Sequence, residues 1–155
     1  MWYHTTCRIC LQKCSAVEQG EPLVDQPYII KQREMMKTVA IIGASDKPER
    51  YSNMAMHALK EHGYDVVLIN PFKSQIEGQK CFKSVDEYDG EIDTVTLYVN
   101  PVRFHDHIKD VIKANPRRVI MNPGTEDKQH EKVLAESGIK VQKACTLVLL
   151  SHNQF

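Results

Sequence analysis

Short apolar runs alternate with amphipathic helical patterns along most of this chain of 155 residues. The first run is Val39–Ile42, and similar runs recur toward the C-terminus with a helical pattern between each pair. Runs of this length that are apolar on both faces are typical of parallel strands buried on both sides of a sheet. Strands that alternate with helices imply right-handed crossovers. The sequence therefore predicts an α/β fold, a Rossmann-like doubly wound sheet of five parallel strands.

The expected elements follow from these patterns and from turn residues at their ends. We predict strands over Thr38–Ile42, Asp65–Asn70, Thr94–Val99, Arg118–Met121 and Ile139–Gln142. We predict helices over Ser52–His62 with Ser52 or Asn53 as its N-cap, over Val102–Asn115 with Val102 facing the core, and from a cap at Thr125 to Ser137. Residues 72–82 are predicted as a loop, Ser84–Glu87 as a helical turn, and Cys145–Leu150 as a short helix packed on the sheet.

The expected strand order places the ligand site. If the first three strands form one mononucleotide-type half, the order is 3-2-1-4-5. Ligands of such sheets bind beyond the C-terminal ends of the strands, where the order reverses. The loops at that edge are Gly43–Tyr51, Asn70–Lys73, Asn100–Arg103 and Asn122–Glu126.

Composition narrows the classes of function. The 20 basic and 20 acidic side chains give no net charge, whereas a nucleic-acid binder usually has a basic excess. No apolar run reaches the length of a membrane helix, and the N-terminus lacks the pattern of a secretory signal. We therefore expect a cytoplasmic protein. The five cysteines are an odd number, so a disulfide framework is not expected.

The first 35 residues differ from the rest. They lack clean periodicity, and we expect them to form a poorly ordered extension before a domain at 36–155. Met35-Met36 leaves a second interpretation open, in which the true start lies there. Cys7, Cys10 and Cys14, with His4 nearby, have a spacing that could bind zinc or an iron–sulfur cluster. The stretch is too compact for the usual two ligand pairs, so we predict no metal site.

The segment from Val39 to Ser52 has the parts of a phosphate receptor. The first strand stops at Gly43, where the backbone can turn sharply and expose its amides. A polar loop follows, with Arg50 near its end and Ser52 at the head of a helical pattern. A Gly turn, a cation and a helix N-terminus together favour an anion.

The same segment carries a family resemblance. Its residues are Gly43-Ala44-Ser45, then Pro48, Arg50, Tyr51 and Ser52. It resembles the opening of the small single-domain CoA-binding proteins, which are relatives of the CoA-binding domain of the succinyl-CoA synthetase alpha subunit. The similarity runs from about Met36 to the C-terminus. It implies that the protein binds CoA or an acyl-CoA. It also implies no catalytic histidine, because in the synthetases that residue belongs to a second domain.

The main rival is a nicotinamide or flavin dinucleotide. That fingerprint needs three glycines after the first strand and an acid at the end of the second. Here the turn has only Gly43, and the second strand ends in Asn70-Pro71-Phe72-Lys73 without an acid. A lysine there suits a ribose that carries a phosphate, as in CoA or NADP. The resemblance favours CoA, because the related domains place a lysine in the corresponding loop. An NADP-binding oxidoreductase-like domain stays open, as does a regulatory or interaction domain without a ligand.

Each candidate site residue has a structural alternative. Gly43 could simply turn the chain, and the prolines after Asn70 and Asn100 could simply end strands. In the related domains these two Asn-Pro loops bracket the adenine and the start of pantetheine, and a Pro-Gly segment precedes a helix, as Pro123-Gly124 does here. The predicted ligand-binding residues are Gly43, Ala44, Ser45, Arg50, Tyr51, Ser52, Asn70, Pro71, Lys73, Asn100, Pro101, Pro123 and Gly124.

No nucleophile and base are paired by the sequence, so we predict no catalytic residue. Cys145 is interpreted first as a small buried residue and second as a thiol that could form a mixed disulfide with CoA. Histidines on the predicted helices, His107 among them, are expected at the surface. The predicted partner is a small CoA ligand, with no nucleic acid or membrane, and a homodimer stays open.

Overall fold

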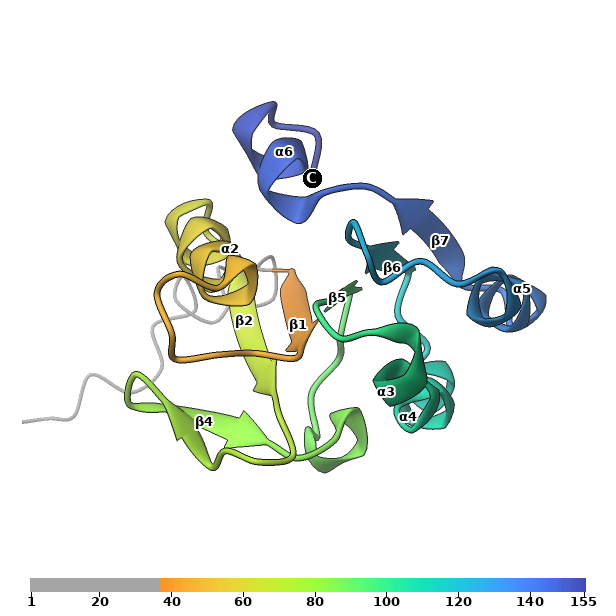
Figure 1. Cartoon of the computed structure of the whole chain (residues 1–155), viewed down its shortest axis with the longest axis horizontal. Coiled ribbons are helices and arrows are strands. Elements are labelled where there is room, and N and C mark those ends of the chain that lie inside the picture. Colours follow the sequence, from red (N-terminus) through yellow and green to blue (C-terminus); the bar gives the residue numbers. More distant parts are fainter. Residues whose placement is uncertain (1–36) are drawn as a thin grey trace, which may run out of the picture. The chain divides into compact units, whose positions relative to one another are not determined.

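The computed structural model describes residues 37–155, and the predictions about residues 1–35 and their cysteines lie outside that range. Seven strands of the described residues form one sheet, parallel except for one short edge strand, with helices on both faces (Figure 1). The α/β class is confirmed, whereas the predicted number of five strands is wrong.

The elements have the following bounds. The strands are β1 (Thr38–Ile42), β2 (Asp65–Ile69), β3 (Gln75–Ile76), β4 (Gln79–Phe82), β5 (Thr94–Leu97), β6 (Arg118–Met121) and β7 (Lys140–Lys143). The helices are α2 (Tyr51–Glu61), α3 (Pro101–His105), α4 (Ile108–Ala114), α5 (Lys128–Glu136) and α6 (Thr146–Ser151), with a 3-10 turn η1 (Val85–Glu87).

The order of the strands differs from the prediction. The sheet runs β3-β4-β2-β1-β5-β6-β7, so the five predicted strands stand in the order 2-1-3-4-5 instead of 3-2-1-4-5. The third predicted strand, β5, pairs in parallel with β1, from Val39 opposite Thr94 to Ile42 opposite Leu97. The place outside β2 is taken by β4. Counted over the six parallel strands, with β4 as the third, the order is 3-2-1-4-5-6, as in the Rossmann fold, and its switch point lies between β1 and β5.

The two additional strands form a hairpin in the segment predicted as a loop. Gln75–Ile76 and Gln79–Phe82 are antiparallel and are joined by Glu77 and Gly78. Both turn residues have positive φ angles, 49° and 78°, the pattern of a type I′ turn. A Glu-Gly pair is a weaker signal for that turn than Asn-Gly or Asp-Gly. The hairpin was therefore missed.

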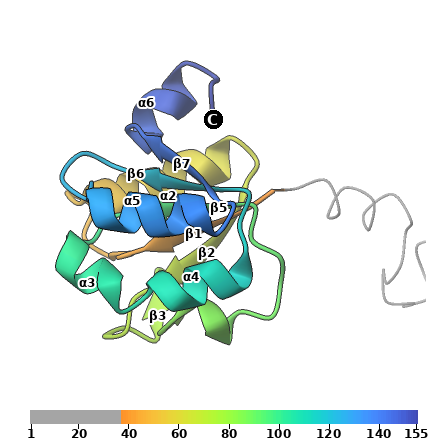
Figure 2. The ribbon, with the colours of Figure 1, turned by 90° about the vertical axis from the view of Figure 1, so that its right-hand side faces the viewer.

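The core has two layers of side chains, one on each face of the sheet. On one face, Ile41 of β1 is buried in a cluster with Leu59 of α2, beside α6. On the other face, Ile42 is buried in a cluster with Phe104 of α3, and α4 and α5 cover the same face (Figure 2). Successive residues of β1 thus point into opposite layers. Burial on both faces explains why the strands read as continuous apolar runs.

The predicted helix Val102–Asn115 is two helices. It begins at Pro101, because the Asn100 side-chain oxygen accepts a hydrogen bond from the Arg103 backbone at 3.0 Å and caps that start. It breaks where the backbone N–H of His107 donates to the carbonyl of Phe104, three residues back instead of four. Val102, predicted to face the core, is exposed, and Phe104 is buried in its place.

Two helix N-termini also differ from the prediction. Helix α2 has Arg50 as its N-cap, while Ser52 and Asn53 are buried within the helix. Helix α5 is capped by Asp127, whose carboxylate accepts hydrogen bonds from the backbone N–H groups of Gln129 and His130 at 2.9 and 2.8 Å. The predicted caps Ser52 and Asn53 thus lie inside the first turn of α2, and the predicted cap Thr125 lies two residues before the cap of α5.

Candidate functional site

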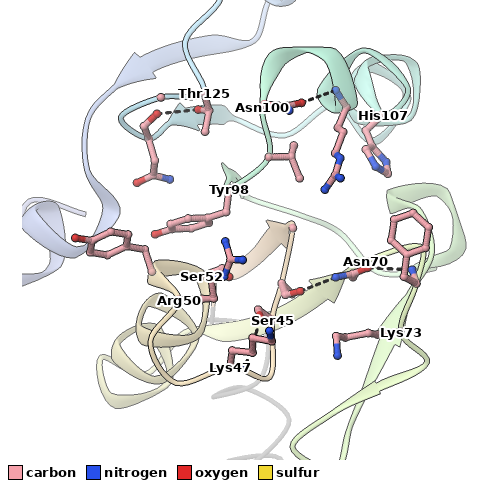
Figure 3. A pocket seen from close by; sticks show the side chains of 18 of the residues that line it. Ser45, Lys47, Arg50, Ser52, Asn70, Lys73, Tyr98, Asn100, His107 and Thr125 are labelled. Carbon is pink, nitrogen blue, oxygen red and sulfur yellow. Dashed lines mark hydrogen bonds between the residues drawn. The ribbon is translucent and has the colours of Figure 1, made fainter.

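A cleft of about 940 Å³ opens at the C-terminal ends of β1, β2, β5 and β6. Its walls are the four loops that the sequence placed at this edge, although the predicted strand order was wrong. All the predicted site residues except Pro101 line it, and Figure 3 shows its walls. Pro101 is the first residue of α3, where a missing N–H costs nothing.

Gly43 turns the chain from β1 into the cleft with a φ of +90°. A Cβ atom at Gly43 would lie 2.7 Å from a Val99 methyl group and 2.9 Å from the carbonyl oxygen of Tyr98. Only glycine fits this close approach of the loops that follow β1 and β5. The amides of Gly43 and Ala44 both donate to the Ile69 carbonyl, at 3.0 and 3.2 Å. The expectation that Gly43 exposes its amides is therefore wrong.

The N-terminus of α2 supplies free amides instead. The N–H groups of Asn53 and Met54 donate to the carbonyl of Arg50, whereas those of Tyr51 and Ser52 have no acceptor among residues 37–155. No side chain of this range caps the helix, and its first turn holds no acidic residue. Free amides and the positive end of the helix dipole attract an anion. Arg50, which lines the cleft here, adds a full positive charge.

Lys73 lines the cleft but its charge is engaged. Its ammonium lies 2.8 Å from a carboxylate oxygen of Asp46. The hydrogen bond from Lys73 holds the pKa of Asp46 below its usual range. The sequence analysis found no acid at the end of the second strand, and it missed this one because Asp46 stands in the loop after β1. The pair joins the two loops across the floor of the site.

Two asparagines of the cleft hold its loops in place. The Asn70 side-chain amide donates to the carbonyl of Ala44 at 2.8 Å, and its oxygen accepts from the Phe72 backbone at 2.9 Å. The side-chain oxygen of Asn100 caps α3. These side chains therefore position the walls of the cleft, a role that the sequence analysis did not consider.

A third asparagine, Asn122, is buried, and both its side-chain nitrogen and its side-chain oxygen are hydrogen-bonded. Its side-chain amide donates to the Thr96 hydroxyl at 2.7 Å and to the Leu97 carbonyl at 3.0 Å, and its oxygen accepts from the Thr146 backbone at 2.8 Å. It thus ties the loop after β6 to β5 and to the start of α6. The nearby amide of Gly124 donates to the Glu126 carboxylate at 2.6 Å, so it is not free for a ligand.

Tyr98 forms part of the wall beneath α6. Its hydroxyl oxygen is buried and has no hydrogen-bond partner among the described residues. Burial raises the pKa of Tyr98 to about 12. The phenol therefore stays neutral at pH values where a free tyrosine would ionise.

This burial makes stability sensitive to alkali. A free tyrosine ionises near pH 10, so between about pH 10 and 12 the unfolded chain loses a proton that the folded chain keeps, and the free energy of unfolding falls as the pH rises. We expect Tyr98→Phe to lose less stability than the wild type over this window, measured by urea unfolding at about pH 9 and 11. An equal alkaline loss in both proteins would contradict the burial of this phenol.

A family model described as a CoA binding domain matches residues 37–151 of this chain. The chain belongs to this family of CoA-binding domains. The resemblance predicted from the residues around Gly43 is thus confirmed. Among solved structures, that of an uncharacterized protein is 37% identical, with a TM-score of 0.72, and the match covers 77% of this chain and 98% of that one. A hypothetical protein from Pyrococcus horikoshii OT3 is 30% identical, with a TM-score of 0.72 over 87% and 97% of the two chains.

Curated relatives match this CoA-binding domain over only part of their own length. The uncharacterized protein YneT of Bacillus subtilis (strain 168) is 37% identical over 62 residues, which cover 40% of this chain and 46% of YneT. The alpha subunit of acetate–CoA ligase [ADP-forming] II of Pyrococcus furiosus is 29% identical over 105 residues, or 63% of this chain and 23% of that subunit. These matches span less than half of either relative.

The cleft of the CoA-binding domain is also lined by residues that are not among the ligand-binding residues predicted from the sequence. They are Asp46, Lys47, Phe72, Tyr98, Val99, Arg103, Asp106, His107, Asn122, Thr125, Cys145 and Leu147. Most stand within or next to the four predicted loops, so the loops themselves were the usable signal. His107, expected at the surface, is half-buried here. Cys145 and Leu147 come from the start of α6, and of the two only Cys145 was considered in the sequence analysis, as a thiol that could meet CoA.

Two classes of site are not seen in residues 37–155. No group of three or more histidine, cysteine, aspartate or glutamate side chains in this range is arranged to hold a metal ion. Nor does this range contain a helix with the length and apolar character needed to span a bilayer. The candidate ligands Cys7, Cys10 and Cys14 lie outside the described residues.

Proposed function

We propose that the cleft binds CoA or an acyl-CoA, with the pyrophosphate at the N-terminus of α2. The observation that carries this proposal is the uncapped start of α2, where the amides of Tyr51 and Ser52 and the guanidinium of Arg50 meet in the cleft. Membership of the CoA-binding domain family supports the choice of ligand.

The end of β2 argues against a dinucleotide with an unphosphorylated ribose. Such a cofactor needs a free carboxylate there to accept a hydrogen bond from the ribose hydroxyl. This position holds Asn70, whose side chain already bonds to Ala44 and Phe72. The carboxylate nearby, Asp46, is bound to Lys73. The end of β2 thus offers no free carboxylate where NAD would need one.

The two ends of the cleft suit the two ends of CoA. Phe72 lines the cleft with 83% of its surface exposed, and a free aromatic ring can stack on adenine. The opposite end includes Val99, Leu147 and the thiol of Cys145, which suit the pantetheine arm. We propose a binding module without catalysis of its own.

Titration calorimetry with CoA, NADP and NAD tests this function. We expect CoA to bind with a dissociation constant in the micromolar range, equivalent to about 8 kcal/mol, and NAD to bind far more weakly. Stronger binding of NADP than of CoA would favour the oxidoreductase-like alternative. No heat with CoA up to about millimolar concentration would overturn the proposal.

A further inference from the structure

The charged side chains of the cleft are unevenly paired. Its lining holds Lys47, Arg50, Lys73 and Arg103, with the carboxylates of Asp46 and Asp106. Within residues 37–155, only Lys73 of these cations forms an ion pair, to Asp46. The three others keep their charge available for a ligand.

Arg103 stands on the wall opposite the α2 N-terminus. It belongs to α3, and its backbone N–H is fixed by the bond to the Asn100 side chain at 3.0 Å. Its guanidinium has no hydrogen bond or ion pair within residues 37–155. The backbone is thus held in place while the side chain is free. That combination suits a residue that receives an anion.

The same wall faces the end of the cleft that suits adenosine. His107, just beyond α3, lies across the cleft from Asn70 and Lys73 (Figure 3). The exposed ring of Phe72 belongs to that same loop. A ribose whose base stacks on Phe72 would therefore lie between the loop and the α3 wall.

Lys73 is the less suitable partner for a phosphate at this position. Its ammonium would have to leave Asp46, and the released carboxylate would then repel the phosphate. The Lys73–Asp46 pair joins the loops after β2 and β1, so its role is to hold the cleft in shape. An anion at the Arg103 guanidinium would break no contact of the described residues.

We propose that Arg103 binds the ribose 3′-phosphate of CoA and sets the preference of the cleft for a phosphorylated ribose. This assignment rests on the proposed function, because it takes the pyrophosphate to lie at Arg50. A planar guanidinium can donate two parallel hydrogen bonds to a phosphate. CoA would then be held by two arginines from opposite walls, Arg50 at the pyrophosphate and Arg103 at the 3′-phosphate.

Calorimetric titration with CoA and with 3′-dephospho-CoA tests the assignment. The wild type should prefer CoA. Arg103→Gln should weaken CoA binding roughly tenfold or more, as expected for losing a charge-assisted hydrogen bond, and should leave 3′-dephospho-CoA binding nearly unchanged. Lys140→Gln, an exposed lysine at the opposite edge of the sheet, is the matched control and should bind both ligands as the wild type does.

A double variant separates Arg103 from Lys73. Asp46→Asn with Lys73→Gln removes the ion pair without leaving a lone charge. Loss of this pair from the cleft wall should weaken the binding of both ligands alike, and under the proposal the ratio of the affinities for CoA and 3′-dephospho-CoA stays as in the wild type. Loss of the preference for CoA in the double variant, or its retention in Arg103→Gln, would overturn the assignment alone. Wild-type protein that binds neither ligand would overturn the proposed function and this assignment with it.

Discussion

Replacing Gly43 with alanine should destabilise the domain by about 2–5 kcal/mol and weaken ligand binding. A residue with a side chain is strained at a φ of +90°, at a cost of about 1–2 kcal/mol. The new methyl group would also lie 2.9 Å from the Tyr98 carbonyl oxygen. Relieving that contact requires a backbone shift, and such overpacking typically costs about 1–3 kcal/mol more. The loops after β1 and β5 would separate at the floor of the cleft.

Gly63→Ala is the control for this experiment. Gly63 has a similar φ of +80°, but a Cβ atom there would meet nothing within 4 Å. Its replacement should cost only the backbone strain, about 1–2 kcal/mol. Urea unfolding of both variants measures the difference. Equal free energies of unfolding for the two variants would show that the close approach of the loops after β1 and β5 does not contribute to stability.

Reversing the charge at Arg50 should abolish CoA binding while leaving the fold intact. Arg50→Glu removes a cation from the start of α2 and places a carboxylate next to the proposed pyrophosphate. The lost charge-assisted hydrogen bond and the new repulsion together should weaken binding by roughly a hundredfold or more. Because Arg50 is exposed, the free energy of unfolding should change little.

Lys140→Glu makes the same change in net charge at the opposite edge of the sheet. This exposed lysine at the start of β7 does not line the cleft. The control variant should bind CoA nearly as the wild type does, since exposed charges at such a distance are screened by salt. If Arg50→Glu kept wild-type affinity in the same titration, CoA would not bind through Arg50 at the start of α2, and the interaction-domain alternative for the cleft would be favoured.

The sequence predicted the parts of this fold that depend on local patterns. Strand β1 and the helix after Gly43 follow from an apolar run, a glycine and a helical pattern, and these are adjacent in the chain. The four cleft loops follow from one further rule, that parallel strands end at the same edge. The edge of the sheet could therefore be found although one of the two neighbours of β1 was assigned wrongly.

The features that were missed depend on contacts between distant residues. The strand order rests on β1 pairing with β5, and both candidate orders satisfy the same local patterns. The Lys73–Asp46 pair joins residues 27 apart in sequence, and Asn122 bonds to residues about as distant. The free amides of the site belong to Tyr51 and Ser52 instead of Gly43, because the Ile69 carbonyl engages Gly43. No periodicity of a single sequence reports such pairings.

A crystal structure of the protein with CoA tests the central claim most directly. The proposal predicts the pyrophosphate within hydrogen-bond distance of the Tyr51 and Ser52 amides and of the Arg50 guanidinium, with the adenosine toward Phe72. CoA bound at any other surface would contradict it. So would a cleft that stays empty at saturating CoA.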